Sequence, residues 1–249
     1  MTETFLSGAQ FDLPLYEGKP RTTYMICSTA RCGSTLLCGL LQSTGCMGVP
    51  HEYFNLANHG QQLIGRLKTT PGLQVTMEEY LGYLVSHRTT DTGVFGLKAH
   101  INQCLPFFQN GLIAKYFGPV KYIAIRRRDL LGQAISLVIA SQTSKWTSHE
   151  TAAAAPAYSS EAIEKALTTS ALHNSLWDQF FLVNGIEPCV VTYEDLLENP
   201  KGEVQKVIDY VGVDADPAVD LARAGLSQEA NSLNRQWKDR FQETLRIQG

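Results

Sequence analysis

The fold is decided by residues 22–41, which read TTYMICSTARCGSTLLCGLL. Residues 22–27 form a β-branched, apolar run typical of a buried strand, and a glycine-containing turn at residues 28–34 follows it. Leucines then recur at helical spacing, at positions 36, 37, 40 and 41. The stretch therefore predicts a strand, a tight turn and a helix, with the turn at the carboxyl end of the strand.

Three further strand-like runs, at residues 94–98, 120–125 and 188–193, are each followed by a helix-like pattern. Apolar strands that alternate with helices are typical of a parallel sheet covered on both faces. In such sheets ligands bind at the carboxyl ends of the strands. We therefore predict an α/β protein with a central parallel β-sheet flanked by helices, and a site at the edge where the turn lies.

Length and composition favour a single domain over residues 1–249, because 249 residues with 44% apolar side chains supply one large core. Residues 1–21 are an N-terminal extension before the first strand. Residues 144–160 contain the run AAAAP and several hydroxyl side chains, and we expect them to form a mobile loop. Apolar residues between Ile163 and Phe181 predict a long core helix that ends before Gly185.

Charge and hydropathy exclude several classes of protein. A net charge of -3 disfavours nucleic acid as a partner. No run approaches the roughly 18 consecutive apolar residues of a transmembrane helix, and residues 1–20 lack the apolar core of a signal peptide. The six cysteines form no C-x-x-C pair and indicate reduced thiols in a cytoplasmic protein. No two histidines have the spacing of a helical ligand pair, so we expect no metal site.

The turn at residues 31–35, Arg-Cys-Gly-Ser-Thr, has the composition of an anion site. The N-terminus of a helix presents unpaired N–H groups to an anion. Gly33 lets the backbone approach the anion, Ser34 and Thr35 add hydroxyl groups, and Arg31 adds a planar cation. The turn lacks the lysine that follows the second glycine of a P-loop. The alternative is an ordinary strand-to-helix turn with a serine cap.

A second group of residues begins with three consecutive arginines at positions 126–128. Asp129, Gln133 and Ser136 follow at spacings that place them on one face of a helix. An arginine beside a hydroxyl group on a helix suits a phosphate monoester. The alternative is a solvated basic turn in which Asp129 caps the helix.

A third group surrounds Glu52, which lies between His51 and the aromatic residues Tyr53 and Phe54. A carboxyl group near apolar surface has a raised pKa and can act as a general base. Aromatic side chains also suit the apolar face of a sugar. The alternative is a surface acid in a loop.

These motifs, in this order, resemble the sulfotransferases that use 3′-phosphoadenosine-5′-phosphosulfate (PAPS). Within that family they are most similar to the bacterial branch typified by the mycobacterial trehalose 2-sulfotransferases. The resemblance covers residues 22–241 and includes further motifs at residues 96–98, 133–136, 142–146 and 237–241.

The resemblance implies a P-loop-like turn that binds the phosphosulfate group, formed by Arg31, Cys32, Gly33, Ser34 and Thr35. It also implies a 3′-phosphate site at Ser136 and an arginine just upstream. The arginine triplet permits two registers, so this arginine is either Arg127 or Arg128. Tyr193 falls near the adenine by the same analogy.

Glu52 falls on the general base that activates the acceptor hydroxyl, and Lys98 is a further candidate for stabilising charge on the leaving group. An acceptor pocket is expected beside residues 51–54, lined by His51, Tyr53 and Phe54.

The implied reaction moves a sulfuryl group from PAPS to a hydroxyl group of a carbohydrate, glycolipid or other small acceptor. It releases adenosine 3′,5′-bisphosphate and needs no metal, and the relatives form homodimers. Val49 and Asn231 stand where the mycobacterial enzymes carry acids, which leaves the acceptor open. Two alternatives are a nucleotide kinase or NTPase on the same sheet, and a non-catalytic nucleotide-binding scaffold.

Overall fold

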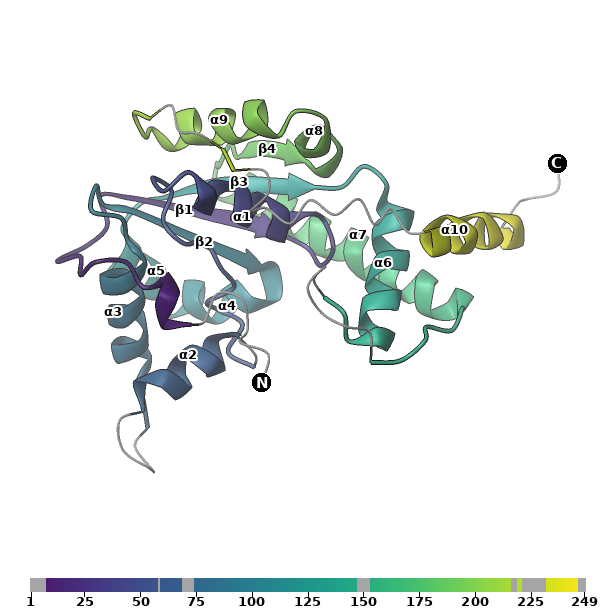
Figure 1. Cartoon of the computed structure of the whole chain (residues 1–249), viewed down its shortest axis with the longest axis horizontal. Coiled ribbons are helices and arrows are strands. Elements are labelled where there is room, and N and C mark those ends of the chain that lie inside the picture. The colour runs from purple at the N-terminus through teal and green to yellow at the C-terminus, as the bar shows by residue number, and fades with distance from the viewer. Residues whose placement is uncertain are drawn as a thin grey trace.

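The computed structural model describes residues 8–57, 59–68, 74–146, 153–215, 219–220 and 232–245. Its centre is a parallel sheet of four strands in the order β2-β1-β3-β4 (Figure 1). The strands are β1 (Thr22–Ser28), β2 (Val94–His100), β3 (Val120–Arg126) and β4 (Cys189–Thr192). The strand order reverses beside β1, and in such sheets the ligand crevice lies at the carboxyl ends of the strands at that point. The predicted α/β fold with a central parallel sheet is confirmed.

Helices cover both faces of the sheet and extend beyond one end of it (Figure 1). In chain order they are a 3₁₀ helix, η1 (Ala9–Phe11), and the α-helices α1 (Ser34–Ser43), α2 (His59–Leu67), α3 (Met77–Arg88), α4 (Ile101–Gln109), α5 (Leu112–Phe117), α6 (Leu130–Thr143), α7 (Ser160–Val183), α8 (Tyr193–Glu198), α9 (Pro200–Val211) and α10 (Ser232–Leu245). The helices at the carboxyl ends of β1 and β3, α1 and α6, begin where the sequence predicts the site.

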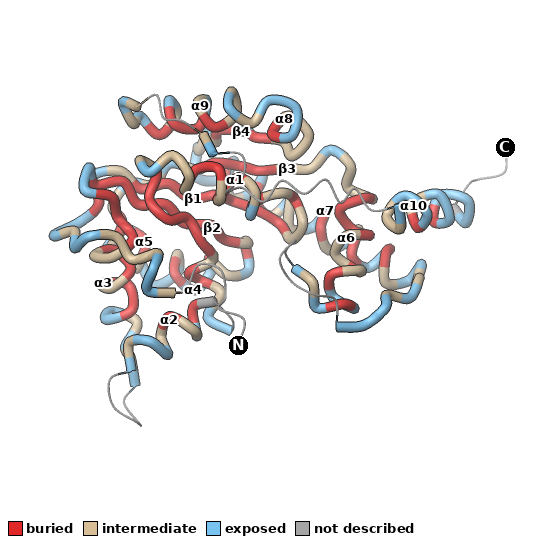
Figure 2. Tube along the Cα trace, viewed as in Figure 1, coloured by how far each residue is buried: buried red, intermediate tan, exposed pale blue. Residues whose placement is uncertain are grey.

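The central strand β1 is buried along nearly all of its length (Figure 2). Its alternate side chains enter two separate cores. Tyr24 and Ile26 pack with side chains of α1 and α9. Met25 and Cys27 pack with side chains of α3, α4 and α7. Because successive strand residues point to opposite faces, a continuous apolar run is what a sheet covered on both sides requires.

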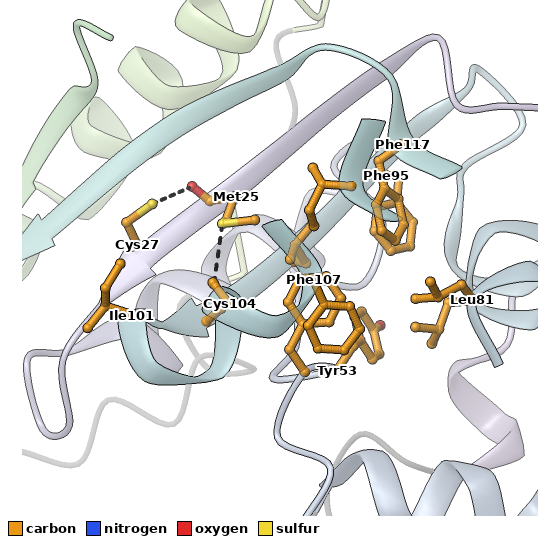
Figure 3. Close-up of a cluster of buried hydrophobic side chains, with 14 of the residues drawn as sticks. Met25, Cys27, Tyr53, Leu81, Phe95, Ile101, Cys104, Phe107 and Phe117 are labelled. Atoms are coloured by element: carbon orange, nitrogen blue, oxygen red, sulfur yellow. Dashed lines mark hydrogen bonds between the residues drawn. The ribbon is translucent and has the colours of Figure 1, made fainter. Parts of the chain in front are cut away.

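The second of these cores is rich in aromatic rings, as Figure 3 shows for Tyr53, Phe95, Phe107 and Phe117. The rings of Phe95 and Phe117 stack with centroids 4.9 Å apart. The ring of Phe54 stacks on Phe107 at 3.8 Å. The two residues that follow Glu52 are therefore held in the core by packed rings, which restrains the position of Glu52.

The long helix α7 confirms the core helix predicted from the sequence: Ile163, Trp177 and Phe181 are buried on one of its faces. Near its start α7 packs against α6, and two side chains of α10, Trp237 and Phe241, complete this third cluster. Residues 147–152 of the predicted mobile loop and Asn231 lie outside the described residues. The rest of the segment 144–160 has no helix or strand before α7, and its mobility stays a prediction.

The described part of the N-terminal extension contacts the helices α2 and α3. Asp12 Oδ1 lies 2.8 Å from Nη2 of the fully buried Arg88, and Asp12 Oδ2 lies 2.6 Å from Nη2 of Arg66. A backbone hydrogen bond of 2.8 Å from Leu13 to His87 adds to this attachment. All six cysteines are free thiols. No helix among the described residues has the length and apolar character to cross a membrane.

Candidate active site

The turn between β1 and α1 has a strained backbone. Arg31 and Gly33 have φ angles of 64° and 95°. A left-handed φ costs a residue with a side chain about 1–2 kcal/mol, and such strain gathers at functional sites. A Cβ on Gly33 would lie 2.4 Å from Cδ2 of Tyr193, so the position requires glycine. No side chain caps the start of α1, and its first N–H groups therefore remain suited to an anion.

The other residues of the turn divide into buried and exposed side chains. Cys32 and Ser34 are buried, whereas Thr35 is exposed. Since the side chain of Cys32 packs in the core that β1 forms with α1 and α9, this residue can offer an anion only its backbone. Thr35 lies in the first turn of α1, and its hydroxyl accepts a hydrogen bond from Lys98 Nζ.

The helix α6 supports the turn, as the sequence predicts. Gln133 Nε2 donates to Thr29 Oγ1 at 2.8 Å and to the carbonyl of Ala30 at 2.7 Å. One turn later Ser136 Oγ accepts a hydrogen bond of 3.0 Å from Arg31 Nε. The first two motifs identified in the sequence therefore meet at one place, because Gln133 and Ser136 share a helix face.

The three arginines at the end of β3 point to different partners. Arg126 Nη2 pairs with Asp178 Oδ1 of α7 at 2.5 Å. Arg128 is exposed, and its Nη1 pairs with Asp195 Oδ1 of α8 at 2.9 Å. Two of the three positive charges are thus neutralised by acids away from the turn. Asp129 caps α6, as expected for a helix start at this point.

Arg127 is the member of the triplet that lies against the turn. Its guanidinium carbon is 4.8 Å from the ring centroid of Tyr193, and its Nη1 lies 3.5 Å from the carbonyl oxygen of Arg31. Its Nε is buried and has no hydrogen-bond partner among the described residues. Of the two arginines that the sequence leaves open, Arg127 lies beside the turn and Arg128 points to α8.

Glu52 lies at the centre of a polar cluster. Its Oε1 is 2.7 Å from Lys98 Nζ and 3.6 Å from His100 Nε2. Its Oε2 accepts hydrogen bonds of 3.1 Å from Asn55 Nδ2 and from Gln103 Nε2. Burial alone would raise the pKa of Glu52, but the ammonium of Lys98 and the contact with His100 hold it well below the usual range. The predicted raised pKa is therefore wrong, because the sequence does not reveal these partners.

Strand pairing explains how Lys98 reaches both Glu52 and the turn. The parallel register sets Lys98 beside Ile26, two residues before the end of β1. The backbone N–H of Lys98 donates to the carbonyl of His51 at 2.9 Å, which holds the segment with Glu52 along β2. Lys98 Nζ also donates to Thr35 Oγ1 at 3.3 Å. Burial would lower the pKa of Lys98, but the carboxylate of Glu52 raises it, so the lysine is a cation.

Three members of this cluster escape the sequence analysis: His100, Gln103 and Asn55. A signal for His100 exists, because Lys98 and His100 alternate along a strand and so point to the same face. Gln103 comes from α4, and nothing in its local pattern indicates a site.

The three residues expected to line the acceptor pocket, His51, Tyr53 and Phe54, are buried. The side chains of Tyr53 and Phe54 are 0% and 3% exposed and pack in the aromatic core (Figure 3 shows Tyr53). His51 is also buried and meets the ring of Tyr53 edge-on at 5.8 Å. Trp146, which is 46% exposed, approaches the turn through its backbone carbonyl, which accepts a hydrogen bond from Arg31 Nη1.

The site therefore combines a turn that carries the cationic Arg31 with an ionised carboxylate, and Lys98 contacts both the turn and the carboxylate. Within the described ranges, no three His, Cys, Asp or Glu side chains are grouped so that they could hold a metal ion. Such an arrangement can bind an anionic group at the turn and accept a proton beside it.

Comparison with known proteins is in accord with this chemistry. The model of the Stf0 sulphotransferase family matches residues 23–244. Trehalose 2-sulfotransferase of Mycobacterium tuberculosis (strain ATCC 35801 / TMC 107 / Erdman) is 28% identical over 257 aligned positions, which cover 88% of this chain and 93% of that protein. Trehalose 2-sulfotransferase of Mycolicibacterium smegmatis (strain ATCC 700084 / mc(2)155) is 26% identical, with coverage of 92% and 97%.

Among solved structures, the sulfotransferase domain from the curacin biosynthetic pathway superposes with a TM-score of 0.52 and 16% identity. That match covers 94% of both chains and supports the fold. The family model spans nearly the whole described structure, including the turn, Glu52 and α6. The chain is therefore a sulfotransferase of the Stf0 family.

Proposed function

We propose that this enzyme transfers a sulfuryl group from PAPS to a hydroxyl group of a small carbohydrate-type acceptor, with Glu52 as the general base. The observation that carries the proposal is the position of Glu52 beside the turn. Lys98 Nζ lies 2.7 Å from the carboxylate of Glu52 and 3.3 Å from the hydroxyl of Thr35. The acid is thus next to the anion site where the sulfuryl group would lie.

The residues around the turn suit the donor. The backbone N–H groups of residues 33–35 and the guanidinium of Arg31 would hold the phosphosulfate. Ser136 and Arg127 would hold the 3′-phosphate, and Tyr193 would lie near the adenine. The uncapped start of α1 and the unpartnered, buried Nε of Arg127 are the features that support this fit.

PAPS supplies the sulfuryl group, whose bond to the phosphate oxygen breaks as the acceptor oxygen bonds to sulfur. Glu52 takes the proton from the acceptor hydroxyl. Arg31 and the N–H groups at the start of α1 stabilise the negative charge left on the phosphate, at about 3 kcal/mol for each well-placed donor. Lys98 shares this charge stabilisation.

The acceptor is proposed from chemistry and likeness together. The two relatives are named for trehalose, a sugar, but they share only 28% and 26% identity with this chain. Val49 is buried and offers no polar group to a sugar. Trp146 is 46% exposed and its backbone carbonyl contacts Arg31, so an aromatic residue is present in this region for a sugar to contact. A homodimer and a cytoplasmic location stay predictions.

Calorimetric titration with adenosine 3′,5′-bisphosphate tests the donor site, with ATP and magnesium as the comparison. We expect metal-independent binding of the bisphosphate and much weaker binding of ATP. Preference for magnesium–ATP would support the kinase alternative and overturn the proposal. The family match favours sulfuryl transfer over that alternative.

Substitution of Glu52 by glutamine tests the base. The variant should bind the bisphosphate and lose transfer to any accepted hydroxyl compound. Turnover within about tenfold of the parent would remove Glu52 from this role.

The two arginine registers are distinguished by comparing Arg127→Ala with Arg128→Ala. Loss of a charge-assisted contact costs about 1.5–3 kcal/mol, which is roughly 10- to 150-fold in affinity. We expect Arg127→Ala to weaken adenosine 3′,5′-bisphosphate by this factor and adenosine 5′-phosphate much less. A larger and equally selective loss in Arg128→Ala would assign the 3′-phosphate to Arg128.

A further inference from the structure

The ammonium group of Lys98 touches two groups that have different tasks in the proposed reaction. It lies 2.7 Å from Glu52 Oε1 and donates to Thr35 Oγ1 at 3.3 Å. Its side chain is buried between them, with 6% exposed. A lysine ammonium carries three protons and rotates freely, so it can strengthen one contact at the cost of the other.

The carboxylate of Glu52, as the structure holds it, is a weak base. Lys98, His100, Asn55 and Gln103 all contact it. A general base works best when its pKa is near the working pH, and the pKa of Glu52 lies well below its usual range. Removal of a proton from an acceptor hydroxyl therefore requires at least one of these contacts to weaken.

We propose that Lys98 couples the donor site to the base: an anion on the turn at residues 31–35 draws the ammonium of Lys98 from Glu52 toward Thr35, and Glu52 becomes an effective base only then. This inference rests on the proposed function. The phosphosulfate of PAPS carries two negative charges, one on the phosphate and one on the sulfate, and the 5′-phosphate of the bisphosphate carries up to two. The carboxylate carries only one, so the turn competes strongly for Lys98 once either group lies there.

Of the groups around Glu52, Lys98 is the charged one that has a second partner toward which it can move. Asn55 and Gln103 are neutral. His100 is fixed from its other side, because its Nδ1 lies 3.1 Å from the carbonyl of Ser28. Cys38 of α1 is a neutral thiol, since burial raises its pKa to about 12.

His100 and the amides therefore keep Glu52 in place when Lys98 withdraws. The carboxylate then loses its closest cation while it remains buried, and both changes raise its pKa.

A double-mutant cycle on bisphosphate binding tests the coupling without any measurement of turnover. The four proteins are the parent, Glu52→Gln, Lys98→Met and the variant with both changes, each titrated with adenosine 3′,5′-bisphosphate at pH 7. We expect Glu52→Gln to bind about tenfold more tightly than the parent, because Lys98 loses its competing partner. Lys98→Met should bind about tenfold more weakly.

The decisive comparison is the effect of Glu52→Gln in the Lys98→Met background. If the carboxylate acts through Lys98, adding Glu52→Gln to Lys98→Met changes the affinity for the bisphosphate less than about twofold. If Glu52 merely repels the anion, the second change tightens binding as much as in the parent, and the coupling is overturned. Unchanged affinity in Glu52→Gln alone would overturn it as well.

Lys98→Met leaves a buried carboxylate without its cation, so a second measurement uses only the parent and Glu52→Gln. At pH 5, titrations in two buffers of different ionisation enthalpy give the number of protons taken up on binding. The parent should take up more protons than Glu52→Gln, because the pKa of Glu52 rises when Lys98 leaves. Equal uptake would overturn the coupling.

These outcomes separate the inference from the proposed function. If the parent binds no bisphosphate, the donor site itself is wrong. If the parent binds it and the cycle is additive, only the role of Lys98 fails.

Discussion

Replacement of Gly33 by alanine changes the turn at its tightest point. The alanine would have to keep the backbone φ of 95° that Gly33 adopts. Its Cβ would lie 2.4 Å from Cδ2 of Tyr193. The left-handed backbone costs about 1–2 kcal/mol and the overpacked ring about 1–3 kcal/mol. The reduced freedom of the unfolded chain returns about 0.4–1 kcal/mol. We therefore expect a loss of about 2.5 kcal/mol in the free energy of unfolding.

Thermal unfolding measures this loss, since about 2.5 kcal/mol lowers the Tm of a chain of this size by roughly 5–10 °C. Gly45→Ala is the matched control: its φ is 74°, and nothing lies within 4 Å of the new Cβ. This control should cost only about 0–1.5 kcal/mol, the backbone share alone. In a Tyr193→Ala background, Gly33→Ala should cost no more than Gly45→Ala.

Two results would refute this reasoning. One is a Tm for Gly33→Ala as high as that of Gly45→Ala, which would mean that the ring moves aside without cost. The other is an equal loss with and without the Tyr193 ring, which would assign the whole effect to the backbone. Bisphosphate affinity should fall together with stability in Gly33→Ala, because the same contact shapes the turn.

Burial would raise the pKa of Asp12, but its contacts with two arginines and a tyrosine hold it below the ordinary value, so its stabilising effect is present above about pH 4 and lost as the pH falls further. In urea unfolding between pH 7 and pH 3, Asp12→Asn should be less stable than the parent at pH 7 and should lose less free energy of unfolding as the pH falls. The same dependence of this free energy on pH in both proteins would contradict the prediction. Trp177→Phe should lose about 1–3 kcal/mol in urea unfolding, because Trp177 Nε1 donates to the carbonyl of Ser28 at 3.1 Å from a fully buried position. Asn199 caps α9 by accepting from the N–H of Gly202 at 3.1 Å, so Asn199→Ala should cost about 1 kcal/mol in calorimetric unfolding and Asn199→Gly only a few tenths.

Much of the fold could be predicted because its signals are local. The apolar run of β1 and the turn after it are readable in consecutive residues, and the apolar face of α7 repeats every three or four positions. The meeting of the turn with Ser136 could be predicted too, because parallel strands bring their carboxyl ends to one edge. The residue types and spacings of the proposed anion site are properties of the chain itself.

The protonation and partners of Glu52 could not be predicted, because they depend on contacts between distant segments. Lys98 reaches the carboxylate through the register of β1 and β2. The burial of Tyr53 and Phe54 follows from packing against α4 and β2, which no local pattern reports.

The sequence by itself determined the parallel α/β architecture, the position of the glycine turn after β1 and the residue types proposed for the site. The tertiary structure decided which arginine faces the turn, since Arg128 is drawn to Asp195 of α8 while Arg127 lies over Tyr193. It also decided that Glu52 is held as a carboxylate by a shared lysine. The physical reason is that residue type fixes which interactions a side chain is able to make, whereas its charge state and direction depend on neighbours that only folding brings together.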